Sequence, residues 1–544
     1  MATLPAALAP ARGWRLAVSR GEAVALACLG LALLLQLELA FAKSVNWDEF
    51  YHFSEIHQYR LGRWSPSLQT PYVHLFSWVP GLPGDNIAHI QLVRALILPF
   101  ELATLVCIYA MARCFAGRAA ALICALAYAT GGYVLLHALA IRADMIAAAL
   151  LSAALWIALC RPLRALELAA LGLLLALAFV ATIKSALYAP AFLGVALLRF
   201  DRSQLRRIAG GAAAAGVAAL VVVSLVVPLA GLTDFARNSA EWMFSAGLFP
   251  QGPYLIKQVT YAPALAVLLA LGAVVAWQRY GARERAALLC LFAPLLTVAI
   301  YRNAYPYHFV FVLPPAMVAA APAAEWLVRR HGAATLSLIL LANAALLSLT
   351  EDRSVLERQK TIQQGVREIF PQPVAYIDES GMIGNFPRAV DRFASGWALE
   401  KYHRAGHPVY RQALEAEPVP LLIGNSHALR NVFAVTGHAD RLLAEDVRAL
   451  RAGYIRHWGE TFVAGMTVAP GTGGIEVAIP GPYTIEGGPI SIDGRPFASG
   501  QVATLGRRRH RVQADGPDPV TLRWGDHLAR PGFAWPAGPI FTDY

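Results

Sequence analysis

The chain has 544 residues, of which 57% are hydrophobic and only 15% charged, and its mean hydropathy is +0.49. In soluble domains about a quarter of the residues are charged, so the composition excludes an ordinary soluble protein. Long apolar runs occupy residues 1–350, and the remainder has soluble composition. The sequence therefore predicts a membrane domain followed by soluble domains.

A helix needs about 20 apolar residues to cross the hydrocarbon core, and about eleven segments meet or approach that length. They are 22–42, 93–112, 119–141, 145–160, 166–183, 186–198, 208–232, 261–278, 286–301, 309–328 and 335–350. The first is too long for a cleaved signal peptide and lacks a small-residue cleavage motif after it, so we expect it to remain as the first span.

Every second connection between these segments is short and rich in arginine. These connections contain Arg12, Arg15, Arg20, Arg113, Arg118, Arg161, Arg164, Arg199, Arg202, Arg206, Arg207, Arg279, Arg283, Arg285, Arg329 and Arg330. Arginine marks cytoplasmic loops, which predicts a cytoplasmic N-terminus. Residues 43–92 and the C-terminal region are then predicted outside the cytoplasm.

The same arginines largely explain the net charge of +11. A basic balance can indicate nucleic-acid binding, but here it serves topology and contact with anionic membrane lipids, so no nucleic-acid partner is predicted. All six cysteines lie within or at the ends of predicted spans, and no disulfide framework is expected.

Two outer loops are long and rich in aromatic residues, at 43–92 and 233–260. Such segments suit helices that lie in the membrane interface. After residue 350, alternating helix and strand patterns predict an α/β domain at 351–453. Short alternating runs broken by glycine and proline predict a β-sandwich at 454–544, with Asp493-Gly494 as a tight turn.

Ionisable residues gather in four connections on the predicted outer side. They are Asp48 and Glu49, Arg142 and Asp144, Lys184, and Arg302 with His308. Charges at membrane depth or in tight loops are costly and therefore indicate function. Carboxylates and cations at one membrane face predict a site that handles both a proton and an anion.

These motifs carry a resemblance. Asp48-Glu49, Arg142-Ala143-Asp144, Thr182-Ile183-Lys184 and the segment 301–315 (YRNAYPYHFVFVLPP) resemble the GT-C superfamily of glycosyltransferases. The chain is most similar to the bacterial protein O-mannosyltransferase and lipid A aminoarabinose transferase group. Relatives often have Arg-Pro-Asp where this chain has Arg-Ala-Asp.

The resemblance implies a mostly α, polytopic GT-C-like membrane protein in the bacterial inner membrane, with a periplasmic C-terminal region. It implies transfer of a sugar from a polyprenyl-phosphate donor to an envelope glycan, lipid or protein acceptor, usually with inversion. Asp48 is the expected general base, and Glu49 tunes it or holds neighbouring residues. The donor phosphate is expected at Lys184, Arg302 and His308, with Arg60 and Arg63 as weaker candidates. Arg142 and Asp144 are expected to pair with each other and to shape the site from behind the residues that touch the substrate.

Each assignment has a simpler structural alternative. Asp48 could be an acid that flanks a helix, and Glu49 could be structural. His308 could be a histidine at the membrane interface whose hydrogen bonds are already made. Lys184 and Arg302 could snorkel to lipid headgroups, and Arg142 with Asp144 reads more readily as a structural ion pair.

Two further groups of charged residues are expected to have structural roles. Glu38 and Glu101, inside predicted spans, are expected as neutral carboxyls hydrogen-bonded to neighbouring helices. The basic run Arg507, Arg508, Arg509 and Arg511 is expected as a solvated strand edge, with an anionic acceptor as the alternative.

Motifs of other classes of catalytic or binding site are absent from the sequence: it has no P-loop, paired CxxC, HExxH or GxSxG. No cofactor is required by the sequence; some GT-C enzymes use a divalent metal beside their acids, but no pattern here demands one. The rival hypotheses are a transporter or flippase of lipid-linked saccharides and a membrane-anchored glycan-binding scaffold. The gathering of charges on one face favours the transferase.

Overall fold

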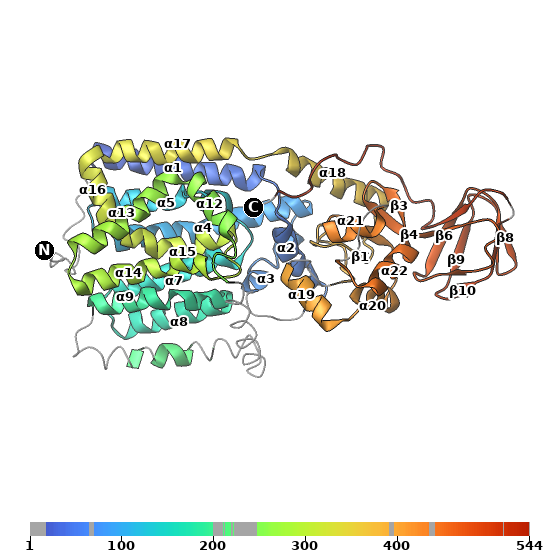
Figure 1. Ribbon diagram of the computed structural model, residues 1–544, viewed down its shortest axis with the longest axis horizontal. Coiled ribbons are helices and arrows are strands. Elements are labelled where there is room, and N and C mark those ends of the chain that lie inside the picture. The colour runs from blue at the N-terminus through green and yellow to red at the C-terminus, as the bar shows by residue number, and fades with distance from the viewer. Residues whose placement is uncertain are drawn as a thin grey trace.

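The computed structural model describes residues 18–64, 70–199, 210–211, 213–218, 221, 247–390, 396–434, 441–514 and 516–542. The molecule is elongated, with a bundle of helices at one end and a region of mixed helices and strands at the other (Figure 1). The N-terminal side of the first helix lies at the far end of the bundle, and the C-terminus lies where the two regions meet.

The bundle is built from long apolar helices joined by short connections. Its members are α1 (Arg20–Ala42), α4 (Asn86–Ala112), α5 (Arg118–Ala129), α6 (Tyr133–His137), α7 (Ala143–Cys160), α8 (Ala165–Ala181), η2 (Ile183–Tyr188), α9 (Ala189–Arg199), α12 (Gly252–Tyr261), α13 (Pro263–Arg279), α14 (Ala282–Leu296), η3 (Thr297–Ala299), α15 (Pro306–Ala319), α16 (Ala321–His331) and α17 (Ala333–Leu349).

Among the described residues, α1, α4 and α7 are long and apolar enough to cross a membrane as single helices. Three bent pairs pass the same test together: α12 with α13, α15 with α16, and α17 with α18 (Ser354–Ile369). The prediction of a polytopic, mostly helical membrane protein with a C-terminal soluble region is confirmed. The predicted span 208–232 and the first half of the outer loop 233–260 lie almost wholly outside the described residues.

The predicted span 119–141 is broken into α5 and α6. The break falls at Gly132, whose φ of 57° favours glycine because a side chain there is strained. A Cβ atom at this position would also lie 2.8 Å from the side-chain oxygen of Gln258. Sequence hydropathy alone misses this break, because the residues on either side are uniformly apolar.

The arginine-rich connections that the structure describes lie at the end of the bundle away from the soluble region (Figure 1). The N–H of Gly117, between α4 and α5, donates to Glu325 of α16 at 2.8 Å. Arg199, at the end of α9, donates to the carbonyl of Ala158 near the end of α7 at 2.6 Å. The alternation seen in the sequence therefore corresponds to two distinct ends of the bundle.

The opposite end is covered by the loop 43–92, where the predicted helices are confirmed as α2 (Trp47–Arg60), α3 (Pro71–Leu75) and η1 (Val79–Gly81). A capping box begins α2: Asn46 accepts from the N–H of Asp48 at 3.1 Å, and Glu49 accepts from the N–H of Asn46 at 3.1 Å. Phe50, Phe53 and Ile56 bury one face of this helix. This seats α2 across the end of the bundle.

The soluble region adds five helices and twelve strands among the described residues. The helices are α18, α19 (Gly396–Ala405), α20 (Val409–Ala416), α21 (His427–Phe433) and α22 (Ala444–Gly453). The strands are β1 (Tyr376–Ile377), β2 (Leu421–Ile423), β3 (Tyr454–Trp458), β4 (Thr461–Val468), β5 (Ile475–Glu476), β6 (Gly481–Glu486), β7 (Ile490–Ile492), β8 (Arg495–Phe497), β9 (Val502–Leu505), β10 (Arg509–His510), β11 (Val512–Ala514) and β12 (Val520–Trp524).

One seven-stranded sheet runs through this region in the order β1-β2-β4-β12-β6-β9, with β3 paired to β4. Strands β1 and β2 are parallel, and β2 pairs with β4 antiparallel. The sheet thus crosses the expected boundary at 453/454, and the α/β and β parts share it. Neighbouring strands shared in this way place the two parts in a fixed relation.

The far end of the soluble region is a small sandwich of two layers. The sheet β11-β7-β8 packs against β12, β6 and β9 through a common core that includes Ile490, Val512, Ile485 and Leu522. The predicted turn at Asp493-Gly494 is confirmed: φ is 51° and 80° at its two residues, which join β7 and β8 as a two-residue hairpin.

A single hydrophobic core extends from the bundle into the soluble region. It contains Phe50 of α2, Ile362 of α18, Phe386, Leu421 of β2 and Val463 of β4. The α/β part therefore packs directly onto the helix that carries Asp48.

The expectation for Glu38 is wrong. Its side chain is 41% exposed and pairs with Arg353 at 2.9 Å, because it lies one turn from the end of α1. Glu101 is fully buried on α4, and within the described part of the chain neither of its carboxyl oxygens has a hydrogen-bond partner.

The basic run is more than a solvated edge. Arg507 donates to the carbonyl of Ala478 at 2.9 Å and to the carbonyls of Leu414 and Glu415 at the end of α20. Arg508 pairs with Asp493 at 2.8 Å. The charge of Arg507 thus ties the sandwich to the α/β part.

Two adjacent acids follow β1 in different surroundings. Asp378 accepts from the N–H groups of Gly381 and Met382, both at 2.8 Å. The pKa of Glu379 is raised to about 8 by burial and by the neighbouring Asp378. Glu379 is only partly buried by exposed area, so water weakens the effect of these neighbours.

Glu379→Gln is expected to raise the melting temperature at pH 8–9 and to leave it unchanged near pH 4.5. A carboxyl whose pKa is raised on folding favours the folded state below its ordinary pKa, about 4.3, and loses that contribution as pH rises through 8. Thermal unfolding across this range measures the difference. Glu368→Gln, at an exposed position of α18, is the matched control and should show no trend; a pH-independent difference for Glu379→Gln contradicts the assignment.

Candidate active site

Four charged side chains form an alternating chain at the end of the bundle that faces the soluble region. Arg142 forms ion pairs with Asp48 and, at 3.1 Å, with Asp144, and Asp144 in turn forms one with Lys184. The order is negative, positive, negative, positive, so the network is neutral. Residues from three separate connections, remote in sequence, are brought together here.

The local backbone structure positions each charged side chain of the network. Asp48 is the second residue of α2 and Asp144 the second residue of α7, where the positive end of a helix dipole favours a carboxylate. Lys184 follows α8 in η2, and its N–H donates to the side chain of Thr182 at 3.3 Å. Helix starts and a cap therefore aim the charged groups at one another.

Aromatic rings of α15 form one wall of the network. The guanidinium of Arg142 stacks on Tyr307 at 3.2 Å from the ring centroid. The ammonium of Lys184 lies 5.1 Å from the centroid of the same ring and 5.9 Å from that of Phe311. These cation–π contacts stabilise the two cations where little water reaches them.

The network is nearly buried but not sealed. The side chains of Asp48, Asp144 and Lys184 are 5–8% exposed, whereas that of Arg142 is 14% exposed. Burial of this degree is tolerable for charges only because each is paired. Arg142 is therefore the member through which a ligand most readily reaches the network.

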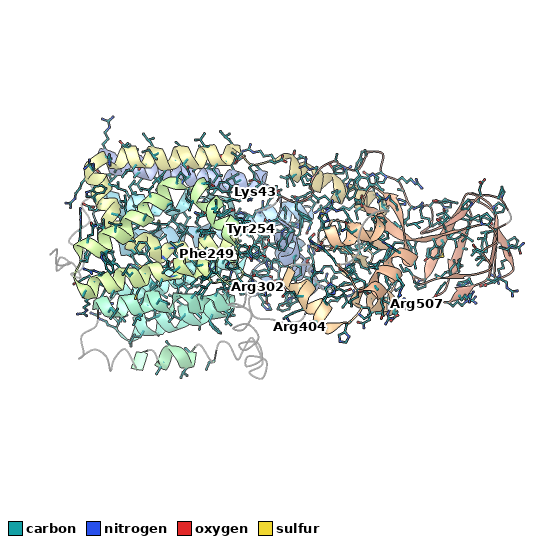
Figure 2. All side chains as sticks on the ribbon, viewed as in Figure 1. Lys43, Phe249, Tyr254, Arg302, Arg404 and Arg507 are labelled. Carbon is teal, nitrogen blue, oxygen red and sulfur yellow. The ribbon has the colours of Figure 1, made fainter. Side chains whose placement is uncertain are left out.

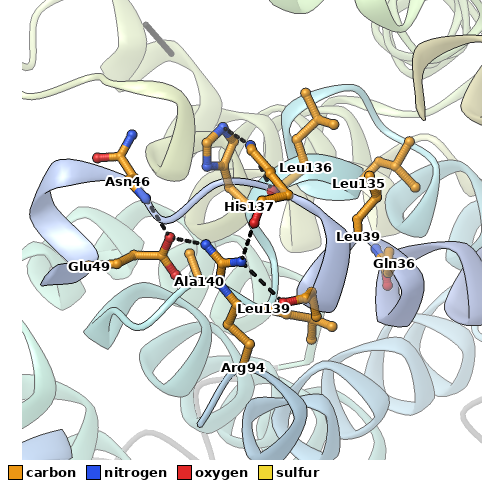
Figure 3. A pocket seen from close by; sticks show the side chains of 12 residues that line it. Gln36, Leu39, Asn46, Glu49, Arg94, Leu135, Leu136, His137, Leu139 and Ala140 are labelled. Carbon is orange, nitrogen blue, oxygen red and sulfur yellow. Dashed lines mark hydrogen bonds and ion pairs between the residues drawn. The ribbon is translucent and has the colours of Figure 1, made fainter. Parts of the chain in front are cut away.

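Glu49 turns away from this network towards Arg94 of α4. Arg94 donates to its two carboxylate oxygens at 2.9 and 2.5 Å, and the N–H of Ile141 donates to it at 3.1 Å. Figure 3 shows this pair beside Asn46. Burial would raise the pKa of Glu49, but Arg94 and the N–H groups of Asn46 and Ile141 lower it below its ordinary value.

Arg94 also ties the end of α1 to the start of α2. Its guanidinium donates to the carbonyls of Ala40 and Lys43 at 3.1 Å and of Ser44 at 2.9 Å. Beside it is a cavity of about 20 Å³, lined in part by Gln36 and His137 (Figure 3). A space of this size holds about one water molecule. The pairing with Arg94, which ties α1 to α2, gives Glu49 a structural role next to the site.

The other predicted phosphate ligands lie at different distances from the network. His308 is fully buried on α15, and its Nε2 lies 3.1 Å from the hydroxyl of Thr297. Its ring lies 6.1 Å from that of Phe311, which also faces Lys184. Arg302 lies at the rim of the bundle (Figure 2) and pairs with Glu400 of α19 at 3.0 Å. His308 therefore borders the network, whereas Arg302 bridges to the soluble region.

Arg60 and Arg63 lie at the exposed end of α2 and just after it, outside the network. Arg63 pairs with Glu417 at 3.4 Å. The guanidinium of Arg60 lies over Gly81 in η1. The structure does not bring these two arginines to the site.

Sequence reasoning missed Arg94 and Tyr307. Arg94 is the second residue of the predicted span 93–112, and a charge in that place is itself a signal of a buried partner. Tyr307 lies within the segment that carries the resemblance, but a tyrosine near the interface is common, and only the fold places it under Arg142. Within the described residues, no group of three or more His, Cys, Asp or Glu side chains could hold a metal ion.

Comparison with solved structures gives the fold. ArnT from Cupriavidus metallidurans bound to undecaprenyl phosphate aligns with a TM-score of 0.53 and 13% identity, over 73% of this chain and 92% of that one. The same protein in the apo state aligns with a TM-score of 0.51 and 13% identity, over 74% and 94%. The protein described here has the GT-C fold.

A third solved structure, the Archaeoglobus fulgidus oligosaccharyltransferase in the apo form, has a TM-score of 0.46 and 12% identity over 85% of this chain and 73% of that one. No family model and no curated protein matches the sequence. With identities this low, the similarity extends to the fold, and the reaction has to follow from the site itself.

Arg94→Met is expected to lower the free energy of unfolding by about 3–5 kcal/mol, because it leaves the buried Glu49 carboxylate without its counter-charge. The double variant Glu49→Leu/Arg94→Met should recover part of that loss. Thermal unfolding of the purified protein in detergent measures both. The exposed pair of Arg63 and Glu417 is the control, and Arg63→Met should cost less than about 1 kcal/mol; similar losses in the two arginine variants would contradict the structural role of Arg94.

Proposed function

We propose that the protein is a glycosyltransferase that moves a sugar from a polyprenyl-phosphate donor to an acceptor hydroxyl at the outer face of the membrane, with inversion. The observation that carries this proposal is the alternating network of Asp48, Arg142, Asp144 and Lys184 at one end of the bundle. It combines a carboxylate for proton removal with cations for a phosphate leaving group. The GT-C fold supports the same assignment.

Asp48 acts as the general base in this proposal. The acceptor hydroxyl attacks the anomeric carbon and transfers its proton to the carboxylate. The bond between the sugar and the phosphate oxygen breaks at the same time. Arg142 pairs with the carboxylate and orients it, and Glu49 holds α2 through Arg94.

Lys184 and Arg142 stabilise the leaving phosphate. Negative charge grows on the phosphate as the glycosidic bond breaks, and cations fixed in place beforehand stabilise it better than water does. Asp144 contacts both cations and holds them in position. His308 borders this site, and Arg302 is assigned to the rim of the donor phosphate site.

An apolar cavity on the other side of α15 suits the polyprenyl chain. It has a volume of about 360 Å³ and lies among α12, α13, α14 and α15. Phe309 and Leu313 of α15 line it, while Tyr307 of the same helix faces Arg142. The same helix thus contributes side chains both to the charged site and to the apolar cavity. The ArnT structure that shares the fold was determined with undecaprenyl phosphate.

The acceptor enters from the side of the soluble region, which covers the same end of the bundle (Figure 1). We place this end on the periplasmic side of the bacterial inner membrane and the N-terminus in the cytoplasm. The gathering of arginine-rich connections at the opposite end supports this orientation. A hydroxyl of an envelope glycan, a lipid or a protein is the acceptor class.

Asp48→Asn is expected to lower kcat by about 10²–10⁴-fold, the usual contribution of a general base. Purified protein is incubated with polyprenyl-phosphate sugar and an envelope extract as acceptor, and release of polyprenyl phosphate is measured. The melting temperature should stay near that of the wild type, because asparagine can still accept from Arg142. Asp85→Asn is the control: Asp85 caps α4, and asparagine caps equally well.

Full activity of Asp48→Asn would rule out this base. If the wild type releases no polyprenyl phosphate but carries lipid-linked saccharides across vesicle membranes, the flippase hypothesis replaces the transferase.

Lys184→Met is expected to lower kcat/KM for the donor roughly 10–100-fold, which corresponds to the loss of a charged hydrogen bond to phosphate of about 1.5–3 kcal/mol. Polyprenyl phosphate without a sugar should inhibit this variant more weakly than the wild type, since the lost contact is to the phosphate. Lys360→Met, on the exposed face of α18, should match the wild type in both measurements. Unchanged inhibition of Lys184→Met would remove Lys184 from the phosphate site.

A further inference from the structure

The end of the chain returns to the helix that carries Asp48. After β12 ends at Trp524, residues 525–542 run back from the sandwich, and the C-terminus lies beside the end of the helical bundle (Figure 1). We call residues 538–542 the C-terminal strap. Its Thr542 contacts Ser44, the first residue of the connection 44–46, which joins α1 to α2 and contains the N-cap of α2.

Gln359 of α18 joins the strap to this connection. Its side-chain amide accepts from the N–H of Val45 at 2.9 Å and donates to the carbonyl of Val45 at 2.7 Å. The same amide donates to the carbonyl of Ile540 in the strap at 2.9 Å. Gln359 is fully buried, as is Val45, so water cannot replace these bonds.

Further contacts hold the strap against α2. The rings of Phe541 and Phe50 meet edge to face with centroids 6.2 Å apart. The hydroxyls of Ser44 and Thr542 lie 3.2 Å apart. Arg358, next to Gln359, donates to the carbonyl of Pro539 at 2.9 Å. The strap thus packs on the first turn of α2 from the side of the soluble region.

The connection 44–46 is held from two sides. Arg94 of α4 donates to the carbonyl of Ser44 at 2.9 Å, and Gln359 holds both backbone groups of Val45. Asn46 then caps α2, and Asp48 is its second residue. A shift of this short connection therefore moves the Asp48 carboxylate relative to Arg142.

We propose that Gln359, through Val45 and the C-terminal strap, is a positioning residue that sets the orientation of Asp48 for catalysis. This inference rests on the proposed function, in which Asp48 is the base. Gln359 does not touch the reacting atoms: it acts on the backbone three residues before the carboxylate. The soluble region and the far end of the chain thereby take part in building the site.

The chain offers a matched control one turn along α18. Gln363 is also buried, and its amide donates to a backbone carbonyl, that of Met382, at 2.9 Å. Its partner does not belong to the connection before α2. Gln359→Leu and Gln363→Leu therefore remove similar buried polar groups, and only the first loosens the start of α2.

Steady-state turnover of the full-length protein with polyprenyl-phosphate sugar is the first measurement. We expect Gln359→Leu to lower kcat about 10–100-fold with KM for the donor within about twofold, since a displacement of about 1 Å of a catalytic group costs up to about 100-fold. Gln363→Leu should keep kcat within about threefold, although both variants melt at lower temperature. Equal losses of kcat in the two variants would overturn the inference.

Hydrogen exchange of the amides in residues 45–53 and 538–542 is the second measurement, and it needs no substrate. Exchange in both segments should rise at least tenfold in Gln359→Leu and stay at the wild-type level in Gln363→Leu. Phe541→Ala, which removes the ring contact of the strap with Phe50 and leaves Gln359 in place, should raise exchange at the start of α2 as well and serves if Gln359→Leu does not fold. Unchanged exchange at residues 45–53 overturns the inference, whatever the turnover.

The two proposals fail separately. Absence of turnover in the wild type, or full activity of Asp48→Asn, overturns the proposed function and with it the catalytic part of this inference. The exchange measurement then decides on its own whether Gln359 holds α2.

Discussion

The structure depends on the pairing of charged side chains that are buried at one end of a hydrophobic helical bundle. A lone buried carboxylate or ammonium costs several kcal/mol, so each charge has to bring a partner. Asp48, Arg142, Asp144 and Lys184 meet this requirement as an alternating chain, and Glu49 meets it with Arg94. The pairing requires that the starts of α2, α7 and η2 lie level with Arg94 inside α4. Much of the fold at this end follows from that requirement.

The adjacent acids of α2 serve different purposes because a helix turns by about 100° per residue. Asp48 points to the connection before α7, and Glu49 points to α4. The first remains in contact with a cation that is partly exposed, where a substrate can compete for it. The second is enclosed by Arg94 and backbone N–H groups, which suits a fixed support.

The soluble region is more than an appended domain. Its core is continuous with that of the bundle through α2 and α18, its sheet joins the α/β part to the sandwich, and its last residues pack against Phe50. Arg302 and Glu400 add a polar link at the rim. The charged network therefore lies at the end of the bundle on which the soluble region packs.

The sequence by itself determined the membrane class, the two ends of the bundle and the segments that send Asp48, Arg142, Asp144 and Lys184 to one face. Hydropathy and arginine placement are local properties that act during insertion, so they can be read without a fold. Only the tertiary structure decided which charges meet: it separated Glu49 from Asp48, placed Tyr307 under Arg142, moved Glu38 to an exposed pair with Arg353, and set Arg60 and Arg63 apart from the site. It also joined Gln359 to a connection more than 300 residues earlier in the chain. Side-chain partners depend on how helices rotate and pack, and that information is spread over the whole chain, so no single motif contains it.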